Sequence, residues 1–372
     1  MSLDAADPPR MAQAPPREHG RIEGDHDITF EVISDENGLE RVAPEWTAVN
    51  ALIGPEGFFT RMELVRANWA RHRKDPRTFL NVLVIRDRGR LVFGAPMLRR
   101  RDRLGTHVLQ WLDSRTPFYD GLLVDPGMDP TAAARLFTYY LEASWTRRAL
   151  KIAYVLEGTA LHRVLVAAGF RLTQRTVAPC VDLTVYETWD AYLAAMPASR
   201  RQQYRNLSRR LGKAGAGPLH IVTDPDERRL EIARIFSRKR EWVKEHDLPD
   251  WIVPPETEAW FQWVAAREDA RNRTHVLRLA AGDEWIASSL CLERDGTIFS
   301  SKMAFNPAWE RFSPGWVLTL EKIRFAIGRQ LSSVDFMIGR TPWKDRVADQ
   351  FRSSFACRVN LLPGRRSLRL PR

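Results

Sequence analysis

The sequence has few cysteines and no long apolar run, and both scarcities restrict what the chain can be. Its three cysteines, Cys180, Cys291 and Cys357, lie far apart in a chain of 372 residues. They match no metal-binding spacing and no disulfide framework, so we expect no metal and a reduced, cytoplasmic setting. No apolar stretch approaches the ~20 residues that a membrane helix needs. Residues 1–27 contain no apolar segment typical of a secretory signal, and their Pro, Ala and charged residues predict a disordered tail.

Signatures of nucleophilic catalysis are missing as well. The chain has no Ser-His-Asp order, no Gly-x-Ser-x-Gly motif and no Cys/His pair suited to a catalytic dyad. These absences exclude the common covalent hydrolases and leave reactions in which the protein supplies only binding, a base and hydrogen-bond donors.

Acidic residues are in deficit, and this deficit predicts an anionic partner. The 46 Asp and Glu residues face 57 Lys and Arg residues, for a net charge of +11, and most of the basic residues are arginines. Arginine favours bidentate contacts with phosphate and carboxylate. We therefore expect a nucleotide-bearing cofactor, a nucleic acid or an anionic membrane surface as the partner.

The length suits two domains, and the hydrophobic pattern repeats across them. We expect an N-terminal domain at 28–183 and a C-terminal domain at 184–372. Each half follows the order strand, helix, helix, three strands, helix, strand, helix, strand. The halves share little sequence identity, so the duplication rests on this pattern alone. The predicted class is α/β with mixed sheets.

The stretch "FNPAWERFSPGWVLTL" (305–320) runs from a predicted strand into a predicted helix. Ser313 is a favoured N-cap residue, Pro314 suits the first helical position, and Gly315 lets a ligand approach the backbone. Unpaired N–H groups and the positive end of the helix dipole make such a helix start an anion site, typically for phosphate. The same three residues also begin helices that bind nothing.

Residues 304–351 resemble the C-terminal signature of the CelD-like branch of the GNAT acyltransferases. The resemblance is carried by Pro314, Gly315 and Leu318 and by a second group that comprises Val334, Asp335, Phe336, Gly339 and Lys344. In the first half, "APMLRR" and "FYDGLLVDP" are similar to the same branch. The resemblance implies two tandem GNAT-like acyl-CoA N-acyltransferase folds related to the Fem-type aminoacyl-transferases.

The resemblance also implies a function for the turn within residues 305–320. In GNAT folds the loop that enters the helix after the fourth strand binds the pyrophosphate of acyl-CoA, a co-substrate, through backbone N–H groups. The residues at that place are Arg311, Phe312, Ser313, Pro314, Gly315 and Trp316. This loop has a single glycine where the common GNAT loop has several, and Trp343 stands where the branch usually has a tyrosine.

Acyl transfer to an amine needs a base, an oxyanion site and close placement of the reactants. Asp335 is the first candidate base, because a carboxylate inside the apolar "VDFMI" has reason to hold its proton. A structural role for Asp335, in capping a helix or holding Lys344, fits the pattern equally well. Asp120 is the second candidate, and Tyr119 and Lys344 are candidate substrate contacts.

The sequence leaves several chemical classes of acceptor open. The branch is associated with envelope polysaccharide synthesis, and relatives acylate long-chain amines, so the resemblance implies an amine or hydroxyl of an envelope lipid or saccharide precursor. An arginine-rich helix places Arg201, Arg205 and Arg209 on one face, which suits an anionic acceptor, peripheral contact with the inner membrane, tRNA or plain solvent. The alternatives are a Fem-like transferase that uses aminoacyl-tRNA and a non-catalytic protein that binds nucleic acid or membrane.

Overall fold

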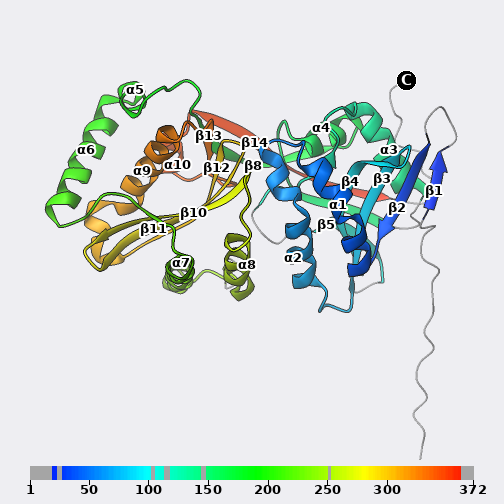
Figure 1. Ribbon diagram of the computed structural model, residues 1–372, viewed down its shortest axis with the longest axis horizontal. Helices are drawn as coiled ribbons and strands as arrows, with labels where there is room; N and C mark the ends of the chain where they lie inside the picture. The colour runs from blue at the N-terminus through cyan, green and yellow to red at the C-terminus, as the bar shows by residue number, and fades with distance from the viewer. Residues whose placement is uncertain are drawn as a thin grey trace, which may run out of the picture.

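A single mixed sheet joins the two halves of the protein. The computed structural model describes residues 19–22, 27–101, 105–112, 118–143, 148–249 and 253–361. Its 14 strands form one sheet in the order β1-β2-β3-β4-β5-β7-β14-β8-β13-β12-β11-β10-β9, with β6 paired to β4. Figure 1 shows the halves side by side, with helices on both faces of the sheet.

The first half alternates strands and helices in the predicted order. Its elements are β1 (His19–Ile22), β2 (Ile28–Ile33), α1 (Glu36–Asn50), the 3-10 helix η1 (Pro55–Thr60), α2 (Met62–His72), β3 (Thr78–Asp87), β4 (Arg90–Arg101), β5 (His107–Trp111), β6 (Leu123–Val124), α3 (Pro130–Ala143), β7 (Arg148–Leu156), α4 (Ala160–Ala167) and β8 (Leu172–Asp182). Helix α3 begins as expected: the Asp129 carboxylate accepts from two N–H groups of its first turn, and Pro130 follows.

The second half repeats this plan after two additional helices. Its elements are α5 (Trp189–Ala195), α6 (Ala198–Lys213), β9 (His220–Val222), α7 (Pro225–Glu245), α8 (Pro255–Ala265), β10 (Asn272–Ala281), β11 (Glu284–Arg294), β12 (Thr297–Phe305), the 3-10 helix η3 (Pro307–Phe312), α9 (Pro314–Gly328), β13 (Ser333–Asp335), α10 (Lys344–Val347) and β14 (Gln350–Leu361).

The two halves exchange their last strands. Strand β14, from the end of the chain, lies between β7 and β8 of the first half, and β8 in turn pairs with β13 of the second half. Each half therefore contributes the same sequence of pairings, with a parallel pair (β5 with β7, β12 with β13) followed by an exchanged antiparallel strand. The predicted duplication is confirmed, but the predicted boundary at residue 183 cuts through a shared sheet, because sequence order does not reveal which strands exchange.

The predicted disordered tail differs from the structure over four residues. Strand β1 pairs antiparallel with β2, with His19 opposite Glu31 and Ile22 opposite Ile28. Composition did not reveal this pairing, because a short edge strand needs little apolar sequence. The rest of the predicted tail, apart from Asp27, lies outside the described residues.

Four buried clusters hold the helices against the sheet. In the second half α5, α6 and α9 cover one face, and α7 and α8 cover the other (Figure 1). The cluster beneath α7 and α8 also takes in Phe58, Phe59, Phe118 and Tyr119 from the first half. Side chains of the first half thus complete the core on the α7 side of the second half.

A buried arginine fastens the two halves together near the α7 side. The guanidinium of Arg294 is 1% exposed and donates to the Asn50 side-chain oxygen at 2.8 Å and to the Asn50 and Ile53 carbonyls at 2.6 and 2.9 Å. A Cβ at Gly57 would lie 2.8 Å from an Arg294 nitrogen, so the backbone here closes directly onto the guanidinium. Arg294 therefore fixes the end of α1 against the second half.

Replacing Arg294 should destabilise the whole chain. Arg294→Met leaves the Asn50 and Ile53 oxygens buried without their donor, and each such loss costs about 1–3 kcal/mol. We expect the free energy of unfolding in urea to fall by about 3 kcal/mol or more, against about 0.5 kcal/mol or less for Arg324→Met, whose side chain is 57% exposed. Equal effects of the two substitutions would contradict the role given to Arg294.

Candidate functional site

The sheet opens between β12 and β13. The two strands pair in parallel over three residues, ending at Phe299 opposite Asp335. Beyond that point the chain after β13 stays bonded to the β8 side, where Phe336 N–H donates to the Pro179 carbonyl at 2.9 Å and Gly339 N–H to the Val177 carbonyl at 3.1 Å. Strand β12 continues to Phe305 alongside β11 alone. Its edge toward β13 thus carries backbone groups that no strand of the described residues pairs with.

A β-bulge lies at the start of this opening. Lys302 is opposite Leu290 and Ser300 is opposite Cys291, so Ser301 is an extra residue in β12. A bulge bends its strand and turns backbone groups out of the ladder. Here it falls two residues beyond the last pair with β13, on the unpaired edge of β12.

A cavity of about 280 Å³ occupies the opening. Its walls include Ser300, Ser301, Lys302 and Met303 of β12, Phe336, Met337 and Ile338 after β13, Trp343 and Lys344 of α10 and its approach, Lys239 and Trp242 of α7, and Phe118 of the first half. We call this cavity the lysine pocket. Apart from the serines and lysines, the lining side chains are aromatic or apolar, and none of them is a carboxylate.

Four lysines from four different elements meet at the lysine pocket. Lys239, Lys302 and Lys344 line it, and the buried Lys322 of α9 donates to Ser300 Oγ at 2.5 Å from behind. The chain has only eight lysines, so half of them gather here. Of these four lysines, only Lys344 was predicted from the sequence as a site residue. The scarcity of lysine in an arginine-rich chain, with three of the eight between residues 302 and 344, was the available signal.

Burial shifts the proton affinity of these lysines. It lowers the pKa of Lys302 to about 8, and the neighbouring Lys239 and Lys344 charges act in the same direction. The pKa of Lys344 is also lowered to about 8 by burial, although Asp335 opposes the shift. Burial likewise lowers the pKa of Lys239 and of Lys322. The pocket is thus a place where positive charge is costly until an anion enters.

Asp335 and Tyr119, predicted from separate motifs, lie together at the apex of the opening. The Tyr119 hydroxyl lies 2.8 and 3.0 Å from the two carboxylate oxygens of Asp335, and both residues are buried. Met337 N–H donates to the same carboxylate at 2.6 Å. Burial raises the pKa of Asp335 above its ordinary value, while the bonds from Tyr119 and Met337 oppose the rise.

Lys344 closes the turn that follows β13. Its ammonium donates to the carbonyls of Met337, Ile338 and Gly339 at 3.2, 3.2 and 2.9 Å. Met337 has φ of 61°, a left-handed conformation that a methionine rarely adopts, and Asp335 and Lys344 hold it from its N–H and carbonyl sides. The predicted pairing of Asp335 with Lys344 therefore acts through the turn between them.

Asp120 does not face a cleft; it closes the matching opening of the first half. Strands β5 and β7 pair in parallel up to Gln110 and Lys151. Beyond them one Asp120 carboxylate oxygen accepts from Ala153 and Tyr154 N–H at 2.9 Å each, and Asp120 N–H donates to the Tyr154 carbonyl. The edge of β7 is thereby satisfied within the chain. In the second half, by contrast, β12 runs past its last pair with β13 without such a carboxylate among the described residues.

The environment of Asp120 predicts a distinctive pH dependence. Burial raises its pKa from 3.8 to about 6, so the folded protein binds more protons than the unfolded chain between those values. The free energy of unfolding then falls as the pH rises through this window. Asp120→Asn keeps an acceptor oxygen without the charge. Relative to wild type it should gain on the order of 2–3 kcal/mol between about pH 4 and pH 6. A pH-independent difference in denaturation curves would contradict this assignment.

The turn at the start of α9 is built differently from the prediction. Ser313 occupies the N-cap position, but its φ of 48° is left-handed and its side chain makes no capping bond. Its carbonyl instead accepts from Trp316 and Val317 N–H at 3.0 and 3.2 Å. A Cβ at Gly315 would lie 3.4 Å from Met303 of β12, so the helix start packs close to the open strand.

The remaining residues of the turn divide between core and surface. Phe312 and Trp316 are buried in the cluster beneath α9, so their rings do not face a ligand. Arg311 is exposed and stacks on Phe312, with its guanidinium carbon 4.9 Å from the ring centre. The indole N–H of Trp316 is buried and has no hydrogen-bond partner among the described residues, so a donor remains unused beside the turn.

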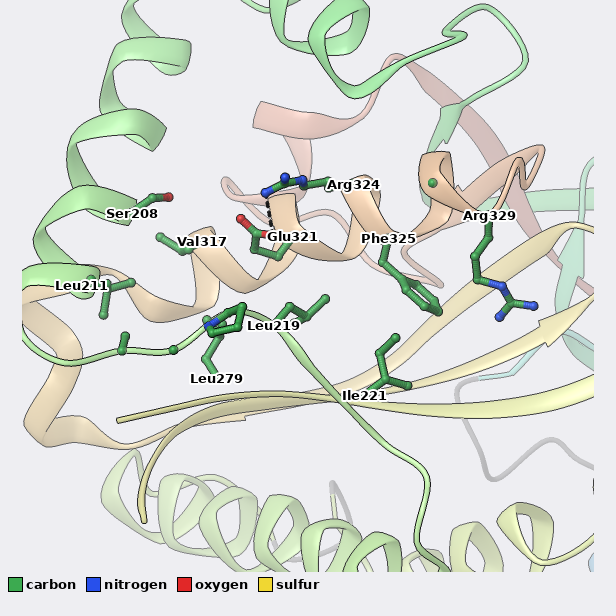
Figure 2. A pocket seen from close by; sticks show the side chains of 15 residues that line it. Ser208, Leu211, Leu219, Ile221, Leu279, Val317, Glu321, Arg324, Phe325 and Arg329 are labelled. Carbon is green, nitrogen blue, oxygen red and sulfur yellow. Dashed lines mark ion pairs between the residues drawn. The ribbon is translucent and has the colours of Figure 1, made fainter. Parts of the chain in front are cut away.

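The largest described cavity lies elsewhere, between α6, α9 and the approach to β9. It measures about 610 Å³, and Figure 2 shows Val317, Glu321 and Phe325 of α9 opposite Leu219 and Ile221. The cavity is lined mainly by apolar side chains and lies on the α9 face, away from Lys239 and Trp242 of α7. In the adjacent α6, Arg201 is occupied with three carbonyls of α5 and its C-terminal turn, which gives it a structural role.

Other site chemistries receive no support from the described part of the chain. Within it no helix is long and apolar enough to cross a membrane, and no cluster of three or more His, Cys, Asp or Glu side chains is placed to hold a metal ion. The cysteines Cys180, Cys291 and Cys357 are free and buried.

Comparison with known proteins identifies the folds. Residues 198–345 match the family described as acetyltransferase (GNAT) domain. FemX has 12% identity and a TM-score of 0.51, over 78% of this chain and 90% of that one. This likeness shows a shared fold.

Two further solved structures are similar over most of the chain. A tandem GNAT protein from the clavulanic acid biosynthesis pathway has 14% identity over 90% of this chain and 98% of that one, with a TM-score of 0.46. The C-terminal domain of a putative lysylphosphatidylglycerol synthetase from Agrobacterium fabrum has 11% identity over 86% and 92%, with a TM-score of 0.49. No curated protein sequence matches the chain. The predicted α/β class with two tandem GNAT-like folds is confirmed.

Proposed function

Because residues 198–345 match the acetyltransferase (GNAT) domain family, we propose that the chain transfers an acyl group from acyl-CoA to an amine or hydroxyl in the opening between β12 and β13. The observation that carries this proposal is the opening itself. Two parallel strands part after Phe299 and Asp335, a bulge follows at Ser301, and a cavity fills the gap. An extended thioester fits between two such strands, where N–H groups on the free edge of β12 would stabilise the oxyanion.

The donor phosphates are assigned to the start of α9. The helix dipole favours an anion at that place, and the turn from Arg311 to Trp316 leads into the helix from the open strand β12. The N–H groups of Ser313, Trp316 and Val317 donate to carbonyls of the chain, so the backbone donor assigned to the phosphates is the Gly315 N–H. The 3.4 Å approach of a Gly315 Cβ position to Met303 supports a donor that passes from the turn to the edge of β12. In this arrangement the acyl group arrives from the α9 face.

Asp335 is assigned the role of the base that takes the proton of the acceptor. Its carboxylate lies at the apex of the opening, and burial raises its pKa, which makes it a stronger base than an exposed aspartate. Tyr119 would lie between the acceptor and Asp335: its oxygen takes the proton of the nucleophile while its own proton passes to the carboxylate. The acceptor nitrogen or oxygen then bonds to the acyl carbon, and CoA leaves as its thiolate.

The first half is proposed to support catalysis without a donor site of its own. Asp120 fills the equivalent opening, and the adjoining Tyr119 and Phe118 reach the second half. One short segment thus closes one opening and completes the other. The proposed acceptor is an envelope lipid or saccharide precursor, met at the membrane surface or within the cytoplasm. The net charge of +11 is consistent with such an acceptor.

The test of the activity is release of free thiol from a panel of acyl-CoAs of different chain length. We expect thiol release with a general amine acceptor to exceed spontaneous hydrolysis, and Ser301→Pro, which removes an N–H at the bulge, to lower it. Transfer that occurs only with aminoacyl-tRNA would move the protein to a Fem-like activity. If neither reaction occurs, the remaining alternative is a non-catalytic binding protein.

The proposed base makes a prediction about pH. Asp335→Asn should lower kcat by about 100-fold or more at neutral pH and less at high pH, where the acceptor amine loses its proton without help. Tyr119→Phe should show the same trend, more weakly. If Asp335→Asn lowers kcat by the same factor at every pH, Asp335 instead has the structural role of holding the turn at Met337.

The donor site makes a prediction about CoA affinity. Gly315→Val should weaken CoA binding by about tenfold or more, because its branched side chain crowds the backbone that meets the phosphates. Valine costs a helix less than ~1 kcal/mol relative to alanine, so the fold should survive. Ser313→Ala is the control with little effect, since Ser313 makes no side-chain cap. Unchanged calorimetric affinity in a folded Gly315→Val protein would remove the donor from this turn.

A further inference from the structure

The lysines of the lysine pocket are withdrawn from water without an acidic partner. Several arginines elsewhere pair with carboxylates, as Arg86 does with Glu45 at 2.9 Å and Arg238 with Glu245 at 2.8 Å, and the lysines Lys74, Lys213 and Lys244 are exposed to solvent. Among the described residues, Lys239, Lys302 and Lys344 form no ion pair within 4.0 Å, although Asp335 acts on Lys344 at longer range. The pocket therefore concentrates positive charge that the chain itself does not neutralise.

Keeping these lysines together away from water is energetically unfavourable. Burial of an ammonium without a counter-charge costs free energy, and neighbouring like charges add to the cost. Core positions filled by methionine or leucine would avoid it. Three of these lysines come together from α7, β12 and α10, with the fourth behind Ser300, so separate elements converge on one small volume. An anion inside the pocket would offset the cost.

The hydrogen-bond donors point to the kind of anion. Lys302 makes no hydrogen bond through its side chain among the described contacts, and Lys239 lies against Trp242, with its nitrogen 5.8 Å from the ring centre. Lys322 donates to Ser300 Oγ, which leaves the Ser300 hydroxyl hydrogen for another acceptor. These donors suit a group with several oxygens. Trp242 and Trp343 provide flat apolar walls for the body of the ligand.

The Lys239 end of the pocket lies on the face of the sheet opposite α9, whereas Met303, Phe336 and Trp343 of its wall pack with the cluster beneath α9. Lys239 and Trp242 belong to α7, which packs on one face of the sheet, whereas α9 packs on the other (Figure 1). The Lys239 end of the pocket therefore lies on the other face from the turn to which the donor phosphates are assigned. A second anionic group, on the other reactant, is required to occupy it.

We propose that the lysine pocket binds a carboxylate or phosphate group carried by the acceptor, and so selects an anionic acceptor for acylation. Naming the ligand as the acceptor rests on the proposed acyltransferase function. The anion contacts Lys239, Lys302 and the Ser300 hydroxyl, and the acceptor nucleophile extends toward the bulge at Ser301. The volume of about 280 Å³ suits the headgroup of a small organic acid or phosphate ester.

The scarcity of lysine makes the proposal directly measurable. With 13C placed at the lysine ε position, the eight side chains are followed by NMR while inorganic phosphate, and separately succinate, is added to the full chain. We expect the Lys239 and Lys302 signals to shift saturably. The titration midpoint of Lys302 should also move upward from about 8 when phosphate is bound, because the anion stabilises the charged form. The exposed Lys74, Lys213 and Lys244 should show no saturable shift.

Two substitutions on one helix provide matched variants. Lys239→Met, in the pocket, should weaken phosphate binding by about tenfold or more, while Lys244→Met, exposed on α7, should change it by less than about twofold. Lys302→Met gives a second test if Lys239→Met fails to fold. Shifts of equal size in the exposed lysines, or no saturable shift at Lys239 and Lys302, would overturn the proposal.

The outcomes separate this inference from the proposed function. The titrations use neither CoA nor turnover, so phosphate binding in the lysine pocket would stand even if no acyl-CoA released thiol. If the protein transfers acyl groups but the Lys302 signal does not respond to anions, the proposal of an anionic acceptor fails and the proposed acyltransferase function stands. A repeat with saturating CoA distinguishes the source of the anion: displacement of phosphate by CoA would assign the pocket to the donor and overturn the proposal.

Discussion

The exchange of β8 and β14 is the constraint on which the site depends. Each strand ends one half and completes the sheet of the other, so neither half has a finished sheet without its partner. This exchange places the segment Phe118–Asp120 beside the opening of the second half, where Tyr119 meets Asp335. The buried Arg294 then fastens the end of α1 to the second half. The site belongs to the pair of halves rather than to one of them.

Duplication followed by different use explains the two openings. Parallel pairs β5–β7 and β12–β13 part in the same way, but the carboxylate of Asp120 satisfies one free edge while the other remains open. In the proposed function, this difference leaves the opening of the second half for the ligand. The cost of burying that carboxylate is visible in its raised pKa. The same three-residue segment supplies a ring and a hydroxyl to the open site.

Much of the fold could be predicted from hydrophobic periodicity and turn residues, because helices and strands leave local patterns. The order of elements in both halves and the start of α9 at Pro314 came from such patterns. Strand exchange, the closing role of Asp120 and the left-handed Ser313 could not be predicted, because each depends on contacts with residues distant in sequence. Among site residues, Asp335, Tyr119 and Lys344 were predicted and lie together. Lys239, Lys302 and Lys322 were missed because a lone lysine carries no motif.

The protein combines two GNAT-like folds with one proposed acyl-CoA site, and the number of CoA molecules bound per chain tests this proposal most directly. Calorimetric titration of the full chain with CoA should give one site, because Asp120 and its segment occupy the equivalent place in the first half. A stoichiometry of two would show that the first opening also accepts a donor. The absence of any CoA binding would contradict the assignment of the β12–β13 opening as an acyl-CoA site.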